Sequence, residues 1–145
     1  MKSLKSLVMI GLTAALLLSS SHAALAKSSK SALKSYKVTF VSATLVENNS
    51  VGNEWYTGAQ VNGQEISEGS SRTLKLKDSD MITLTVEAEE EDKVPESGED
   101  SKEIKVSSLS KKKTTSTIDV IVTENRGRYS GNTAKWTFAF KIEKL

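Results

Sequence analysis

Alternation of apolar and polar side chains is the feature that most limits what this chain can fold into. It is clearest near the C-terminus, in "TAKWTFAFKIEKL". The apolar face of this segment consists of Trp136, Phe138, Phe140 and Ile142. The opposite face consists of Lys135, Thr137, Ala139 and Lys141. A period of two residues predicts a β-strand with its apolar face in a core.

The same period recurs through the chain, and no window after residue 34 shows a helical period. The predicted strands are 35–46, 54–61, 64–67, 72–77, 81–88, 103–109, 117–124 and 133–145. The pattern changes face near Ser42, which predicts a bulge. Asn62-Gly63 separates two short β-like segments and predicts a hairpin turn. About eight short strands with turns rich in Asn, Gly, Ser and Asp indicate an all-β fold, a single antiparallel β-sandwich, with a closed barrel as the alternative.

The N-terminal residues have the composition of a cleavable signal peptide. Two lysines precede an apolar run from Leu7 to Leu18, which is shorter than the about 20 residues that span a bilayer. Cleavage is predicted after Ala26, with Ala23 as the alternative. We therefore expect a secreted bacterial protein with no transmembrane segment after processing. The predicted organisation is a signal peptide (1–26), a flexible lead-in (27–35) and one β-sandwich domain (36–145).

Without the leader, the chain has neither histidine nor cysteine, because His22 is the single histidine. The leader also carries two of the 20 basic residues, so 18 basic and 18 acidic residues remain. Ser-His and Cys-His nucleophile pairs are thereby excluded, and so are ordinary zinc, copper and haem ligand sets. The balanced charge gives no reason to expect a nucleic-acid partner. Carboxylates and carbonyls remain, and these are ligands for calcium.

The stretch from Glu87 to Glu103 is strongly acidic, with nine carboxylates and two lysines. We predict a loop over 89–102 that is either a solvated spacer or a cation site. Antiparallel strands reverse at every connection, so alternate connections share one end of a sandwich. The connections predicted to share the acidic end are 47–53, 67–71, 89–102 and 124–132. The lysine run 111–113 is predicted at the opposite end.

Two motifs resemble small secreted bacterial β-sandwich modules of the calcium-dependent C-two type. They are "ENNSVGNEW" and, about 35 residues later, "EEEDKVPESG", within roughly residues 36–105. The acidic stretch does not have EF-hand spacing, because Lys93 falls on the first ligand position. The resemblance implies a calcium ion held by Asn48, Asn49, Glu91, Asp92 and Glu96. Such loops favour aspartate, whereas this chain mostly offers glutamate.

No arrangement of residues in the sequence indicates catalysis. Glycoside hydrolysis needs two positioned carboxylates on rigid elements, and most candidates here fall on predicted loops. We expect a non-catalytic, monomeric binding or interaction protein, with calcium as a possible stabilising ion. Its partner would be an unknown protein, the cell wall or a membrane surface. The alternative is a small secreted effector, such as a toxin, an antimicrobial protein or an enzyme inhibitor, acting through loops or a strand edge.

Overall fold

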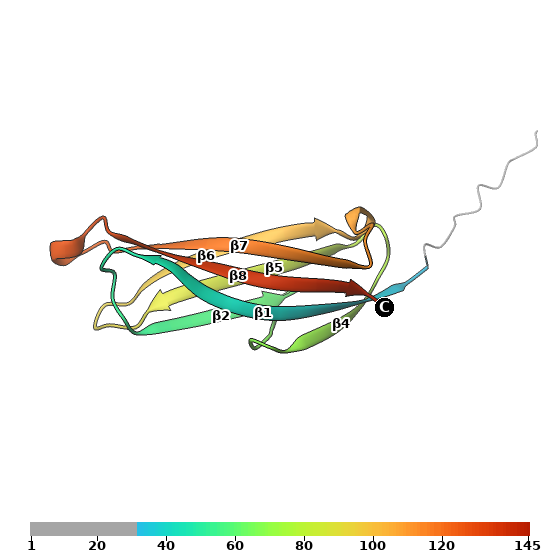
Figure 1. Ribbon diagram of the computed structural model, residues 1–145, viewed down its shortest axis with the longest axis horizontal. Helices are drawn as coiled ribbons and strands as arrows, with labels where there is room; N and C mark the ends of the chain where they lie inside the picture. The colour runs from blue at the N-terminus through green and yellow to red at the C-terminus, as the bar shows by residue number, and fades with distance from the viewer. Residues whose placement is uncertain (1–31) are drawn as a thin grey trace, which may run out of the picture.

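Two four-stranded antiparallel sheets pack face to face (Figure 1). The computed structural model describes residues 32–145, so the predicted leader, its cleavage sites and most of the lead-in lie outside the described residues. Sheet A has the order β4-β1-β8-β7, and sheet B has the order β3-β2-β5-β6. The strands are β1 (Lys34–Asn48), β2 (Trp55–Val61), β3 (Gln64–Glu65), β4 (Ser71–Leu76), β5 (Met81–Glu90), β6 (Glu96–Lys105), β7 (Lys113–Thr123) and β8 (Thr133–Lys144). The predicted all-β sandwich is confirmed.

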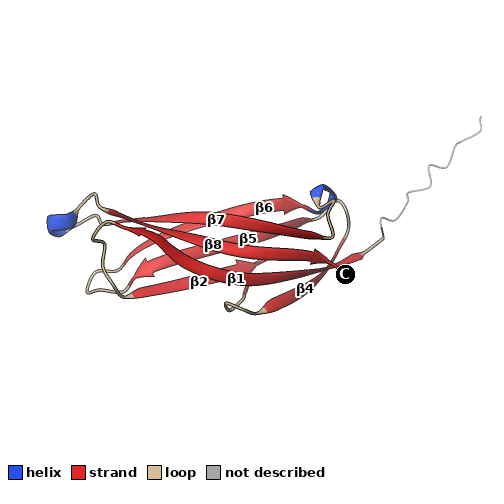
Figure 2. Cartoon of the chain, in the orientation of Figure 1, coloured by secondary structure: helices blue, strands red, loops and turns tan. Residues whose placement is uncertain are grey.

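Two short 3-10 turns lie at opposite ends of the sandwich (Figure 2). They are η1 (Val106–Ser108) and η2 (Gly127–Tyr129). Within residues 32–145, no helix is long and apolar enough to cross a membrane.

The core lies between the sheets and is filled by the alternating positions that the sequence predicted. In β8, Phe138, Phe140 and Ile142 are buried, and Trp136 packs edge-on against Trp55 with ring centroids 5.5 Å apart. The buried apolar side chains of β5 and β7 are Ile82, Leu84, Val86, Ala88, Ile118, Val120 and Val122. Apolar burial contributes about 25 cal/mol per Å², so the inner faces of both sheets favour folding.

Strand β1 is bent by two irregularities in its pairing with β8 (Figure 1). The first lies between Phe40 and Ser42, where the sequence predicted a bulge, and the second between Leu45 and Glu47. In each case the extra residue is a valine, Val41 or Val46, and both are exposed. A bulge inserts one unpaired residue, which explains why the buried face of β1 changes phase at these points.

The Asn62-Gly63 turn is confirmed as the connection between β2 and β3. Both residues have positive φ, 50° and 73°, as a two-residue hairpin turn requires. The Asn62 side chain also accepts the Thr83 N–H at 2.8 Å, which fixes the turn against β5.

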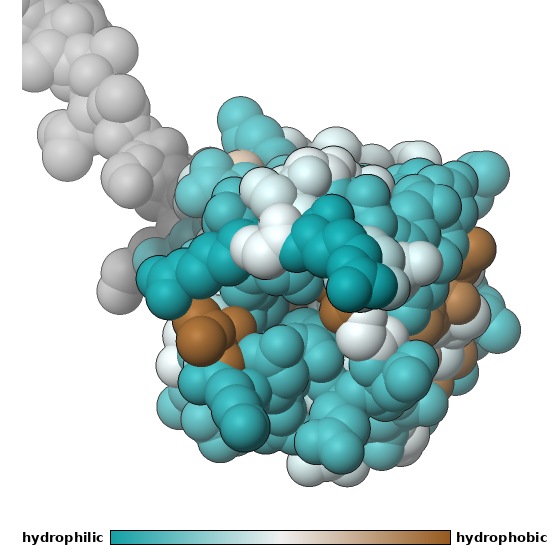
Figure 3. Space-filling view, turned by 90° about the vertical axis from the view of Figure 1, so that its left-hand side faces the viewer, coloured by the Kyte–Doolittle hydropathy of each residue, from teal (hydrophilic) through white to brown (hydrophobic). Residues whose placement is uncertain are grey.

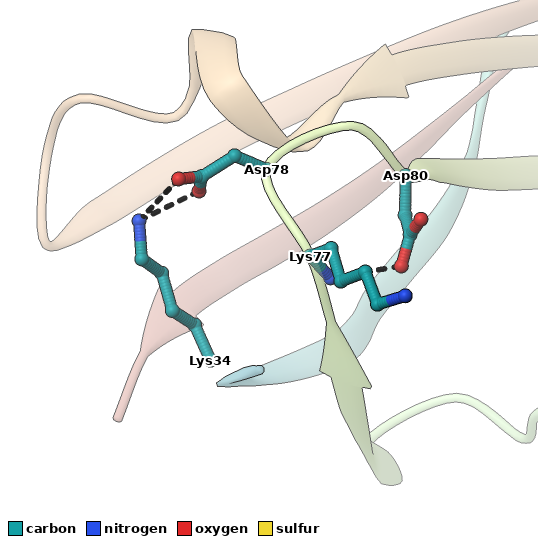
Figure 4. Close-up of polar contacts among 4 residues, drawn as sticks. All are labelled: Lys34, Lys77, Asp78 and Asp80. Carbon is teal, nitrogen blue, oxygen red and sulfur yellow. Dashed lines mark hydrogen bonds and ion pairs between the residues drawn. The ribbon is translucent and has the colours of Figure 1, made fainter. Parts of the chain in front are cut away.

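Strand β1 begins at Lys34, two residues before the predicted domain boundary at Tyr36. Lys34 Nζ lies 2.6 Å from Asp78 Oδ1, in the turn between β4 and β5 (Figure 4). The same turn is closed by Asp80 Oδ2, which accepts the Lys77 N–H at 2.8 Å. The two ends of the described chain meet here, because the Leu145 N–H donates to the Ser35 carbonyl at 2.9 Å.

Two predictions about the connections are wrong. The acidic stretch 89–102 is not one long loop, because β5 runs to Glu90 and β6 starts at Glu96. Glu90 and Glu96 are buried, whereas residues 91–95 and 99–102 are exposed, so most of the charges are solvated without interrupting the strands. Residues 67–71 do not lie at the acidic end either, since the Ser70 carbonyl accepts the Phe40 N–H in the middle of β1. The run 111–113 does lie at the far end, as predicted, where Lys113 pairs with Glu143.

Candidate functional site

Three connections meet at the acidic end of the sandwich, which lies at the left of Figure 1 and faces the viewer in Figure 3. They are residues 49–54, 91–95 and 124–132. The Glu91 N–H donates to the Glu54 carbonyl at 2.8 Å, and the Asn49 N–H donates to the Thr133 carbonyl at 3.0 Å. The surface of this end is mostly hydrophilic, with apolar side chains in separate patches (Figure 3).

Four of the five predicted calcium ligands lie in or beside these connections, and three of their side chains bond within the chain. Asn48 Oδ1 accepts the N–H of the residue three positions on, at 2.9 Å. Asp92 Oδ1 accepts the N–H two positions on, at 2.6 Å. The Asn49 amide donates to the Thr133 hydroxyl at 3.4 Å, and Glu91 is exposed. Asn48 and Asp92 thus use a side-chain oxygen to shape their own loops.

The fifth predicted ligand, Glu96, is different because it is buried, with only 8% of its surface exposed. Its Oε1 accepts the Asn125 N–H at 2.7 Å, whereas its buried Oε2 has no hydrogen-bond partner. Its cross-strand partner is Glu90, which is 5% exposed. Directly paired residues share a face, so two carboxyl groups enter the same end of the core.

Glu90 falls in the acidic stretch but is not one of the five predicted ligands, and its burial was not predicted from the sequence. It continues the buried phase of Ile82, Leu84, Val86 and Ala88 by one more step. Burial raises the pKa of Glu90, and the negative charge of Asp92 adds to the rise. The carboxyl group lies against Gly52, where an added Cβ would be 2.1 Å from Glu90 Oε1 and where φ is +122°. Only glycine suits both the backbone conformation and the contact.

The acidic members of the predicted calcium set, Glu91, Asp92 and Glu96, are not gathered into one group, and the set as a whole stays a prediction. Among residues 32–145, no group of three or more acidic, histidine or cysteine side chains is placed to hold a metal ion. Glu90 and Glu96 offer four carboxylate oxygens, and one already accepts the Asn125 N–H. Calcium takes six to eight oxygen ligands, so this pair alone falls well short.

We therefore expect thermal unfolding curves in EDTA and in millimolar calcium to superimpose, with magnesium as the control ion. A bound ion would raise the melting temperature by mass action. A calcium-specific rise of several degrees that disappears in Asp92→Asn and Glu96→Gln would contradict this expectation. Such a result would support the calcium site that the sequence resemblance implies.

A second feature is a groove of about 300 Å³ on sheet B. It is lined by β2 from Tyr56 to Gln60, by residues 65–68 and by Glu87 and Glu99 from the neighbouring strands. An added Cβ at Gly58 would lie 2.6 Å from Glu87 Oε1 and 2.9 Å from the Tyr56 hydroxyl. These two polar groups therefore lie over Gly58, where a side chain would displace them.

Tyr56 is 46% exposed in this groove, whereas its neighbour Trp55 is half-buried against Trp136. Partial burial raises the pKa of Tyr56, and the negative charge of Glu87 adds to the rise. The phenol is consequently neutral across the physiological range, and its ring lies beside a carboxylate. An aromatic face next to a negative charge suits a cationic group.

The outer face of sheet B carries carboxylates with no basic partners. The pairing register places five of them on this face: Glu65, Glu87, Glu89, Glu99 and Glu103. None takes part in the four ion pairs formed within residues 32–145. Glu87 and Glu99 are directly paired, and like charges in that position repel each other. The negative charge of this face is therefore not neutralised by ion pairs within the described residues.

The outer face of sheet A differs, because two of its carboxylates, Asp119 and Glu143, have lysine partners. Lys135 Nζ lies 2.8 Å from Asp119 Oδ2, and Lys141 Nζ lies 3.1 Å from Glu143 Oε2. Hydrogen bonding to Lys135 lowers the pKa of Asp119, and hydrogen bonding to Lys141 lowers the pKa of Glu143. The two outer faces thus differ in electrostatic character even though the acidic and basic residues of the chain nearly balance.

A scan against protein-family models and a search of curated proteins found no match to this chain.

Proposed function

We propose that this chain is a secreted, non-catalytic binding protein that takes a positively charged partner on the outer face of sheet B. Secretion is inferred from the leader sequence alone. The observation that supports the binding role is the set of five carboxylates that form no ion pair within residues 32–145. Three of them, Glu65, Glu87 and Glu99, line a groove together with Tyr56. Unneutralised charge on one face attracts an opposite charge and guides its approach.

The chemistry of this face favours binding over catalysis. Glu87 and Glu99 lie on adjacent strands of an open sheet face, and the chain beyond residue 26 has no imidazole or thiol. The buried pair Glu90 and Glu96 lies on the opposite, inner face of the same strands. A lysine or arginine side chain placed over Tyr56 would meet both the ring and the Glu87 carboxylate.

Binding of oligolysine, measured by titration calorimetry at low and high salt, tests this proposal. We expect binding at low salt that weakens as salt is added. The Glu87→Gln/Glu99→Gln double variant should weaken it about fivefold, since it removes two exposed charge pairs. The matched control is Glu47→Gln/Asp119→Asn on the outer face of sheet A, which changes the net charge equally and should leave the affinity within about twofold.

Equal weakening by both double variants would show that only the overall charge matters. No binding of oligolysine at low salt would reject the proposed function.

A further inference from the structure

The edge of β2 is open along most of its length. Strand β3 pairs only with Gln60 and Val61, and the Ile66 N–H donates to the Ala59 carbonyl at 3.0 Å. Nothing in residues 32–145 pairs as a strand with this edge before Ala59. In Figure 1, this part of β2 runs along the border of the molecule.

The free backbone groups on this edge can be identified from the register. Asn62 donates its N–H to Thr83 in β5, so even-numbered residues of β2 direct their backbone groups toward β5. The odd-numbered residues direct their backbone N–H and C=O groups away from β5, to the free edge; these residues are Trp55, Thr57 and Ala59. The hydrogen bonds within residues 32–145 include none to the backbone of Thr57. Unpaired N–H and C=O groups in a row form a template for another strand.

The groove reaches this edge. It is lined by β2 from Tyr56 to Gln60, by the segment 65–68 beside the edge, and by Thr85, Val86, Glu87 and Glu99 of β5 and β6. It therefore extends from the free edge of β2 over the neighbouring strands of sheet B. The other wall of the groove is the segment from Glu65 to Glu68. This segment lies close to β1, because the Ala43 N–H donates to the Glu68 carboxylate at 3.3 Å.

The strand edges at the opposite border of the sandwich are less available. At the opposite border, β6 lies close to β7, and Lys102 Nζ donates to the Thr117 carbonyl at 3.3 Å. An added Cβ at Gly98 would lie 2.4 Å from the Ile121 carbonyl oxygen. Backbone groups of β7 are thus in contact with β6 and are not open to a new strand.

We propose that β2 pairs through this edge with an extended peptide segment of a partner protein in which basic and apolar residues alternate. This deepens the proposed function by naming the partner chemistry, and it rests on that function. Backbone hydrogen bonds to Thr57 and Trp55 supply the pairing. Side chains on one face of the added strand meet the Glu65 and Glu87 carboxylates, and those on the other face lie toward Phe40 and Ile66, which also line the groove.

The test uses the peptide KTKVKTKVK, with ETEVETEVE as the control of opposite charge, in titration calorimetry against the intact protein. We expect only the basic peptide to bind. Two versions of it carry N-methyl groups, either on the lysine amides or on the threonine and valine amides. A peptide that pairs through one edge directs one set of N–H groups to β2 and the other set to solvent. N-methylation of the set that faces β2 should lower the affinity about tenfold, as expected for a lost hydrogen bond. N-methylation of the other set should leave the affinity nearly unchanged.

Variants of the protein give an independent measurement. Thr57→Pro removes an N–H from the free edge, where proline is tolerated, and should lower the affinity for KTKVKTKVK about tenfold. Thr57→Val keeps the N–H and should leave the affinity unchanged. If oligolysine binds but both N-methylated peptides match the parent, strand pairing is rejected and the cationic site stands. If neither oligolysine nor KTKVKTKVK binds, the proposed function fails as well.

Discussion

The Gly98→Val substitution is expected to lower the free energy of unfolding by about 3 kcal/mol, the upper part of the usual cost of overpacking. Gly98 lies on the inner face of β6, paired with Ala88. An added Cβ would be 2.4 Å from the Ile121 carbonyl oxygen and 2.9 Å from Val120 Cγ1. The first of these is a backbone atom, so the clash can be relieved only by moving β6 away from β7.

Urea unfolding followed by tryptophan fluorescence measures this effect, because Trp55 and Trp136 pack against each other and against the core. The control is Ser97→Val on the same strand, where the side chain points to solvent opposite Glu89. A surface change of this kind usually alters stability by no more than about 0.5 kcal/mol. Equal destabilisation by the two valines would mean that β6 tolerates any change poorly and that the close approach of Gly98 is not the cause.

The Glu90→Gln substitution is expected to stabilise the protein at neutral pH, by roughly 1 kcal/mol, the order of the cost of a poorly compensated buried polar group. Glu90 is buried beside Glu96, and its pKa is raised by burial and by the charges of Asp92, Glu124 and Glu54. Glutamine has nearly the same shape without the charge. The matched control is Glu91→Gln, which removes an exposed neighbouring carboxylate and should have little effect.

The advantage of Glu90→Gln should depend on pH in a defined direction. Because the folded-state pKa of Glu90 lies above its ordinary value of 4.5, the folded state binds this proton more tightly than the unfolded state. The charge on Glu90 therefore has its full destabilising effect at pH values above the folded-state pKa. This effect disappears as the pH falls from the folded-state pKa to the ordinary value of 4.5. Unfolding free energies of the wild type and the variant should converge over that pH range. A constant difference at all pH values would show that the Glu90 charge is not responsible.

The sequence predicts the parts of the fold that depend on local pattern. The apolar stripe of β8, the bulge near Ser42 and the Asn62-Gly63 turn all follow from a few adjacent residues. The acidic stretch was predicted wrongly because charge density was read as a loop. Its residues Glu87, Ala88 and Glu89 already alternate between the two faces of β5, and that periodicity, not the number of charges, determines the structure.

The candidate sites depend on pairings that no local pattern contains. Glu90 meets Glu96 only because the connection between β5 and β6 is five residues long, from 91 to 95. A shift of one residue in that register would move Glu96 to the exposed face. Likewise, the edge of β2 is open because β3 has only two residues, and the sequence predicted a longer segment there, 64–67.

The position of the chain ends determines how the domain responds to a pulling force. Residues Lys34 and Leu145 lie at the same end, on the antiparallel neighbours β1 and β8. A load applied to both ends would open the β1–β8 ladder one hydrogen bond at a time, starting from the Leu145 to Ser35 bond, instead of shearing many bonds together. This domain should therefore extend at low force, with the acidic end the last part to separate.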